Sequence, residues 1–344
     1  MHMADALISP AVGATMCAVS AGLIAYSSKK VKDAADDRKV PLMGVLGAFI
    51  FAAQMINFSI PATGSSGHLG GGMILSILLG PYAAFLVMAS VLVVQALFFG
   101  DGGLLALGCN IFNLGFFPCF IVYPLIYKKI VGDDPAKGKI MTGSLIAAIV
   151  GLQLGAFGVV LETVFSGISE LPFSTFVLLM QPIHLAIGIV EGLVTAAVVI
   201  FVWNARPEIL NAAVRSEPIG QINIKKVLVG LLAAAVIIGG ALSWFASANP
   251  DGLEWAMFKT AGVEELESDH GLYESLSALQ EKTAFLPGYG FKQSESQVEP
   301  EAASEPAWPA VDPGTSVSGI VGGGLTLLVV LLIGLFLRRR KVSH

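Results

Sequence analysis

Long apolar stretches, separated by short basic clusters, constrain this chain more than any other feature. A helical membrane crossing needs about 20 apolar residues, and stretches of about that length lie at 5–26, 41–58, 82–99, 104–127, 140–165, 174–203, 225–246 and 317–337. Only 13% of the 344 residues are charged, whereas soluble domains carry about 25%. We therefore expect an all-α multi-pass membrane protein.

The basic residues predict which side of the membrane each end of the chain occupies. No basic residue precedes the first apolar stretch, so it is expected to be a retained helix and not a cleaved signal peptide. Lys29, Lys30 and Lys32 follow that stretch, and basic residues concentrate in cytoplasmic loops. The N-terminus, with His2, is therefore expected outside, and the basic C-terminal end is expected in the cytoplasm.

Lys128 and Lys129 are cytoplasmic in this orientation only if the stretch 72–99 is split into two helices at Gly80-Pro81. Proline cannot continue a helix cleanly and disfavours helical geometry in the residue before it. A short segment near 68–80 would then enter the bilayer and a second helix would return. This predicts a domain, 1–205, with seven crossings, and places the loop 57–68 outside.

A polar connector, 206–224, is expected to join this domain to a second one at 225–344, which has two membrane helices. Between those helices lies an external segment, 247–316, with 13 acidic residues and three lysines. Its Glu/Ser/Pro-rich part, near 293–313, has the composition of a flexible linker. The favoured interpretation is a solvated, disordered acidic tether, and the alternative is direct attraction of cations.

His2 stands next to the terminal amine, and the two together form a chelating unit. The Met1 amine, the His2 amide after deprotonation and the His2 imidazole Nδ1 can close two fused rings around one metal ion. Three such coplanar nitrogens suit Ni(II) or Cu(II) better than tetrahedral Zn(II). His68, which follows Gly67 in the external loop, is the candidate fourth donor. The alternative is that His2 is an exposed residue at the membrane interface.

Several polar side chains fall within or beside the apolar stretches, where such groups are costly and usually functional. Asp101 and Gln95 lie near the external end of one stretch, and Asn110 and Asn113 lie early in the next. They are candidates for a hydrogen-bonded network that orients the ligand histidines. Alternatively, Asp101 caps the start of a helix by accepting from free N–H groups.

His184 and Glu191 are seven residues apart and so share one helix face. They are compatible with a metal relay or, as the favoured alternative, with a hydrogen-bonded pair between helices. Small residues also recur along these helices and suit close contact with a partner protein or packing inside the chain. They include Ala147, Ala148, Gly151, Gly155, Gly188 and Gly192.

Several motifs that would indicate a particular activity or site are absent from the sequence. The sequence has no G-x-x-x-x-G-K-[ST], so the chain is not expected to bind nucleotide phosphates or hydrolyse ATP. It has no HExxH, the signature of a zinc protease. Cys17, Cys109 and Cys119 all lie in apolar stretches and form no Cys-x-x-Cys pair. We therefore expect neither an enzyme nor a disulfide framework.

Four stretches together resemble the substrate-binding membrane component of nickel/cobalt energy-coupling-factor transporters. They are MHMADALISP at the N-terminus, SIPATGSSGHLGGG (59–72), QALFFGDGGLLALGCNIFN (95–113) and HLAIGIVEGLVTA (184–196). PDGLE (250–254) resembles the small accessory membrane component of the same systems. The chain is thus similar to a fusion of the two components.

This resemblance implies a helix bundle that captures Ni(II) from outside the cell for an ATP-driven importer in the cell membrane. In the family the metal ligands correspond to Met1, His2 and His68. A separate ATPase and a transmembrane coupling subunit are the implied partners; no cofactor and no nucleic acid are expected. The alternatives are the same role for Co(II) or a membrane sensor or assembly protein that does not transport.

Overall fold

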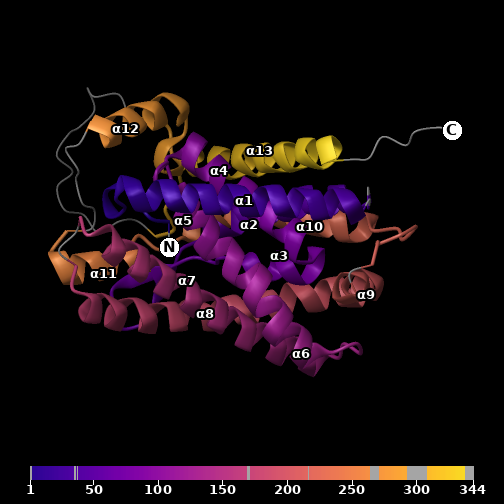
Figure 1. Cartoon of the computed structure of the whole chain (residues 1–344). Coiled ribbons are helices and arrows are strands. Elements are labelled where there is room, and N and C mark those ends of the chain that lie inside the picture. Colours follow the sequence, from indigo (N-terminus) through magenta and orange to yellow (C-terminus); the bar gives the residue numbers. More distant parts are fainter. Residues whose placement is uncertain are drawn as a thin grey trace.

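The computed structural model describes residues 2–34, 36, 38–168, 171–215, 217–263, 271–292 and 308–337. Its main body is a bundle of long helices that run roughly side by side (Figure 1). Within these residues, six helical segments are long and apolar enough to cross a membrane: Pro10–Ala34, Pro81–Phe99, Leu107–Val131, Lys137–Ser166, Phe173–Ala205 and Pro313–Leu337. The prediction of an all-α multi-pass membrane protein is confirmed.

A short 3-10 turn, Asp5–Leu7, leads into α1 (Pro10–Ala34) and α2 (Lys39–Gln54). The loop after α2 contains a feature that was not predicted, an antiparallel hairpin of β1 (Phe58–Ile60) and β2 (Ser65–Gly67). Ser59 lies opposite Ser66 in the register of this hairpin. The hairpin holds the segment that precedes His68 in a defined extended shape.

The predicted break at Gly80-Pro81 is confirmed. Helix α3 (Gly72–Leu79) ends directly before Gly80, which has φ +77°, and α4 (Pro81–Val94) begins with the proline in its first turn. All eight residues of α3 are buried, and eight helical residues span only about 12 Å. Helix α3 is thus shorter than the segment expected at 68–80, and the count of seven crossings stays a prediction.

Two π-helical stretches interrupt the regular helices. Residues Gln95–Phe99 continue α4, and Phe112–Tyr127 connects α5 (Leu107–Ile111) to α6 (Lys128–Val131). Such π-helical turns are rare in proteins overall, but many of those that occur lie at functional sites. Gln95 and Asn113, both singled out from the sequence, lie in these stretches.

Helices α7 (Lys137–Ser166) and α8 (Phe173–Ala205) pack closely through the predicted small residues. A Cβ on Gly188 would come within 2.8 Å of the Ile149 Cα, and one on Gly192 within 2.6 Å of the Leu145 Cα. These positions of α8 therefore serve packing inside the chain, the second of the two interpretations.

The C-terminal part contains α9 (Pro207–Arg215), α10 (Lys225–Gly240), α11 (Gly252–Ala261), α12 (Gly271–Thr283) and α13 (Pro313–Leu337), with 3-10 turns at Leu242–Phe245 and Pro287–Tyr289. The connector is not simply polar, because α9 buries Ile209, Leu210 and Val214. Helix α13 packs against α10, and a Cβ on Gly319 would overlap the Gly239 backbone.

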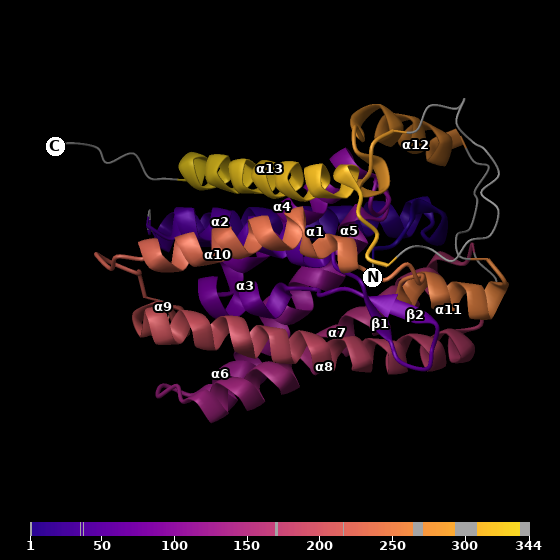
Figure 2. The same ribbon diagram turned by 180° about the vertical axis from the view of Figure 1, so that it is seen from behind.

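The interpretation of 247–316 as a disordered tether is wrong for the residues that the structure describes. Helix α11 lies beside the hairpin β1–β2 (Figure 2), and the Trp255 indole N–H donates to the Thr63 carbonyl at 2.9 Å. The Tyr273 hydroxyl, in α12, donates to the Ile8 carbonyl at 2.8 Å. Apolar and aromatic residues thus dock this segment on the first domain; the stretch 293–307 lies outside the described residues.

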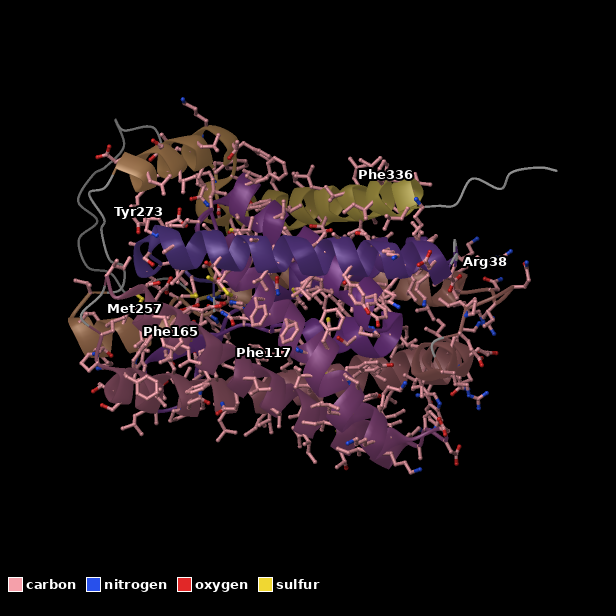
Figure 3. The ribbon with its side chains drawn as sticks, in the orientation of Figure 1. Arg38, Phe117, Phe165, Met257, Tyr273 and Phe336 are labelled. Atoms are coloured by element: carbon pink, nitrogen blue, oxygen red, sulfur yellow. The ribbon has the colours of Figure 1, made fainter. Side chains whose placement is uncertain are left out.

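The two ends of the bundle differ in what they carry. Tyr273 and Met257 lie at one end, whereas Arg38 and Phe336 lie at the other (Figure 3). We call the first the α11/α12 end. The contacts below show that His2 lies at this end.

Candidate metal centre

Hydrogen bonds hold the N-terminal segment against α5 and the loop that precedes it. The Met3 N–H donates to the Asn110 Oδ1 at 2.8 Å, and the Asn110 amide donates back to the Met3 carbonyl at 3.2 Å. Asp5 Oδ1 accepts from the backbone N–H groups of Leu105 and Ala106 at 2.7 and 3.0 Å. The capping role considered for Asp101 thus belongs to Asp5. Met1 lies outside the described residues.

These contacts place His2 beside Asp101. The His2 Nδ1 lies 2.7 Å from the Asp101 Oδ1, and the Tyr289 hydroxyl donates to the Asp101 Oδ2. Burial would raise the pKa of Asp101, but its contacts with His2 and Tyr289 lower that pKa below its usual value. Asp101 is therefore a carboxylate that can only accept, so the His2 Nδ1 carries the proton.

The other ring nitrogen of His2 is left without a partner. The His2 side chain is only 7% exposed. Its Nε2 is buried and has no hydrogen bond. Buried polar atoms are nearly always satisfied, so an unsatisfied nitrogen marks a place where a ligand can bind.

His68 approaches His2 from the loop after β2. The two ring centroids are 5.0 Å apart with a tilt of 31°. His68 Nδ1 donates to the Leu69 carbonyl at 3.0 Å, which leaves Nε2 as its lone-pair donor. Burial is the main cause that lowers the pKa of His68 to about 4. The neutral imidazole that results is the form that binds metals.

Gln95 acts on the loop after His68 through an intermediate residue. Its amide donates to the Gln54 Oε1 at 2.8 Å, and the Gln54 amide donates to the Gly70 carbonyl at 2.8 Å. From the opposite side, Glu191 accepts from the N–H groups of Gly70 and Gly71. The loop is thus held between α2 and α8.

The remaining candidates lie farther from the two histidines. Asn113 donates to the Glu162 carboxylate at 2.6 Å rather than to His2 or His68. His184 and Glu191 do not form a hydrogen bond with each other. The His184 Nδ1 instead donates to the Met180 carbonyl of its own helix at 2.8 Å. His184 does line, with His68 and Asp251, a small cavity of about 10 Å³, room for about one water.

The C-terminal domain contributes residues that the sequence interpretation missed. Asp251 caps α11 in a reciprocal capping box with Glu254. Burial would raise the pKa of Asp251, but nearby positive charge and the hydrogen bond from the Glu254 N–H lower it to about 2. The spacing Asp-x-x-Glu in PDGLE signals such a box. No comparable signal exists for Tyr289, because its contact with Asp101 joins residues 188 positions apart.

The segment around PDGLE also bonds to the histidine loop. The Ser66 N–H donates to the Pro250 carbonyl at 2.8 Å, and the Ser66 hydroxyl donates to the Asn249 carbonyl at the same distance. Two larger cavities, of about 650 and 410 Å³, reach His2, and both are lined by His2, Asp101, Glu254, Gly288 and Tyr289. The site therefore lies at the junction of the two domains.

Side chains alone do not form a metal cage here. Among the described residues there is no group of three His, Cys, Asp or Glu side chains arranged to hold a metal ion. A metal ion bound by His2 and His68 would need further donors from the backbone, the terminal amine or solvent. Neutral imidazoles with backbone nitrogens suit late transition metals.

Comparison with known proteins gives matches over both parts of the chain. The family described as "Cobalt uptake substrate-specific transmembrane region" matches residues 2–209, and the PDGLE domain matches residues 225–339. A fused nickel transport protein of Rhodobacter capsulatus is 30% identical over 79% of this chain and 78% of its own length. A protein of Archaeoglobus fulgidus, also described as a fused nickel transport protein, is 29% identical over 98% of both chains.

A solved structure matches part of the chain. The crystal structure described as a truncated transition metal transporter is 31% identical, with a TM-score of 0.53, and the match covers 60% of this chain and 99% of that one.

Proposed function

Because the chain belongs to the family of cobalt-uptake substrate-specific transmembrane regions, we propose that it is the metal-capture component of an ATP-driven importer for nickel ions. The metal ion is its cargo. The single observation that carries this proposal is that the imidazoles of His2 and His68 lie against each other, with ring centroids 5.0 Å apart. Imidazoles are the commonest protein ligands of metal ions, so two of them in contact suit a metal-binding site.

In this proposal four nitrogens hold the ion in a nearly square-planar arrangement. They are the Met1 amine, the His2 amide, the His2 Nδ1 and an imidazole nitrogen of His68. Asn110 fixes the backbone next to His2, Asp101 contacts the His2 imidazole, and Gln95 acts on the His68 loop through Gln54. Asn113 supports α7 through Glu162.

Nickel is proposed over cobalt for two reasons. Four nitrogens in a plane favour Ni(II), and fused relatives that match both domains are described as nickel transport proteins. The alternative is the same role for Co(II), which the family description names.

We further propose that residues 1–205 bind the metal, that 206–224 connect the domains and that 225–344 form the accessory domain. The α11/α12 end faces the outside of the cell and the opposite end faces the cytoplasm. There, a separate ATPase and a transmembrane coupling subunit drive import into the cell.

The test is nickel binding by purified protein with its native terminus. The proposal predicts tight binding and a yellow, diamagnetic Ni(II) complex. It also predicts loss of tight binding in His2→Ala, in His68→Ala and in a variant with an uncleaved N-terminal extension. Tight binding by the extended variant, or an octahedral complex, would contradict the amine-ligand arrangement.

A further inference from the structure

Tyr289 is the residue of the C-terminal domain that reaches the His2 site through a hydrogen-bonded chain. Its hydroxyl donates to one oxygen of Asp101, and the other oxygen accepts from the His2 Nδ1 at 2.7 Å. The carboxylate thus has one oxygen fixed by each domain, and its orientation depends on both.

The backbone of Tyr289 is in an unusual conformation that the packing maintains. Its φ is +61°, in the left-handed region that bulky side chains rarely adopt, and it follows Gly288 at φ +59°. Such positions persist only where the surroundings hold them, and they cluster at functional sites. The Tyr289 ring stacks on Phe99 with centroids 5.1 Å apart. This stacking directs the hydroxyl toward Asp101.

The contact between His2 and Asp101 uses the same nitrogen that the proposed chelate needs. Asp101 as a carboxylate can only accept, so the His2 Nδ1 donates its proton to this bond. A metal ion at Nδ1 requires that nitrogen to be unprotonated and turned away from Asp101. The two arrangements exclude each other, and whatever stabilises Asp101 in its present orientation opposes the metal.

The cavities on either side leave room for this exchange. Tyr289, Asp101 and His2 line both the cavity of about 650 Å³ and that of about 410 Å³. Both the Asp101 carboxylate and the His2 imidazole therefore border open space.

We propose that Tyr289 is a positioning residue through which the PDGLE domain, acting on Asp101, competes with the metal ion for His2 Nδ1. This inference rests on the proposed function, because it requires a metal ion at His2. The accessory domain then lowers the affinity of the site for the metal ion and speeds dissociation of the ion. Without the hydroxyl, Asp101 loses a charge-assisted hydrogen bond and the metal ion meets less competition.

The test compares Tyr289→Phe with Tyr273→Phe in full-length protein with its native terminus. Tyr289→Phe keeps the ring on Phe99 and removes only the hydroxyl. Tyr273→Phe removes a hydroxyl that also joins the two domains but bonds to Ile8 and not to Asp101. The dissociation constant and dissociation rate of Ni(II) are measured by competition with a chromophoric chelator. Thermal unfolding confirms that both variants are folded.

We expect Tyr289→Phe to bind Ni(II) roughly tenfold more tightly and to release it more slowly, as loss of one hydrogen bond to a charged group predicts. Tyr273→Phe should match the wild type. Equal or weaker binding by Tyr289→Phe overturns the inference. In an Asp101→Asn background the Tyr289→Phe change should add nothing; an undiminished effect there also overturns it.

These outcomes separate the inference from the function on which it rests. A wild-type protein that does not bind Ni(II) tightly contradicts the proposed function itself. A wild-type protein that binds tightly, together with an unchanged Tyr289→Phe variant, contradicts only the role of Tyr289.

Discussion

The Gly70 N–H donates to the Glu191 carboxylate at 2.7 Å, which joins the loop after His68 to the middle of α8. The Gly71 N–H reaches the other carboxylate oxygen at 3.2 Å. A charged group buried in a membrane bundle is expensive unless its oxygens are satisfied. Here two backbone donors satisfy it, and the same bonds define the shape of the loop that presents His68.

Replacing Glu191 is therefore expected to loosen this loop. In Glu191→Ala both glycine N–H groups lose their acceptor, and we expect the Ni(II) affinity to fall by at least tenfold, as the loss of hydrogen bonds to a charged group predicts. Calorimetric titration measures this. Glu162→Ala is the matched control, since Glu162 is also buried but bonds to Asn113; an equal loss in both variants would contradict a specific role for Glu191.

Asn110 is expected to order the N-terminal segment. Asn110→Leu removes both bonds to the Met3 backbone, so the Met3 amide should exchange its hydrogen faster and Ni(II) should bind less tightly. Hydrogen exchange followed by mass spectrometry measures the first effect, and titration measures the second. Asn113→Leu changes a buried asparagine three residues away and should leave the Met3 amide as protected as in the wild type.

Asp251 is expected to make the stability of the metal-free protein depend on pH. Its pKa, about 2, is below the usual 3.8, so the folded state favours the ionised form. That stabilisation is fully present above about pH 4 and is lost as the pH falls toward 2.

The measurement is the unfolding temperature of the wild type and of Asp251→Asn between pH 7 and pH 2.5. The wild type should be more stable at pH 7, and the gap should narrow below about pH 4. Asp133→Asn, at an exposed loop position, serves as the control with no comparable gap. A gap that stays constant down to pH 2.5 would show that the Asp251 charge does not stabilise the fold.

Helix α13 offers a test of its packing on α10. A Cβ on Gly319 would overlap the Gly239 backbone, whereas nothing lies within 4 Å of a Cβ on Gly324. We expect Gly319→Val to lower the unfolding temperature, because overpacking costs about 1–3 kcal/mol. Gly324→Val should leave that temperature nearly unchanged; the same decrease in both would mean that α13 does not pack on α10 at Gly319.

Local sequence patterns were enough to predict the class of the protein and the interruptions of its helices. Apolar stretches such as 174–203 appear as helix α8 because, in a bilayer, the backbone must satisfy its own hydrogen bonds. The break at Gly80-Pro81 was predictable since proline and its neighbour restrict the backbone locally. His2 and His68 were also predicted as metal ligands from local features, namely the position of His2 next to the terminal amine and the glycine-rich loop around His68.

The surroundings of those two histidines depend on long-range packing and could not be predicted. The tertiary structure brings Asp101 to His2, assigns the capping role to Asp5 and docks the segment that carries Asp251 and Tyr289 on the first domain. The composition of that segment predicted a tether because it is rich in acidic residues. The apolar residues that dock it on the first domain are fewer. Contacts between residues far apart in the chain depend on how whole helices pack, and no local pattern encodes which side chains then meet.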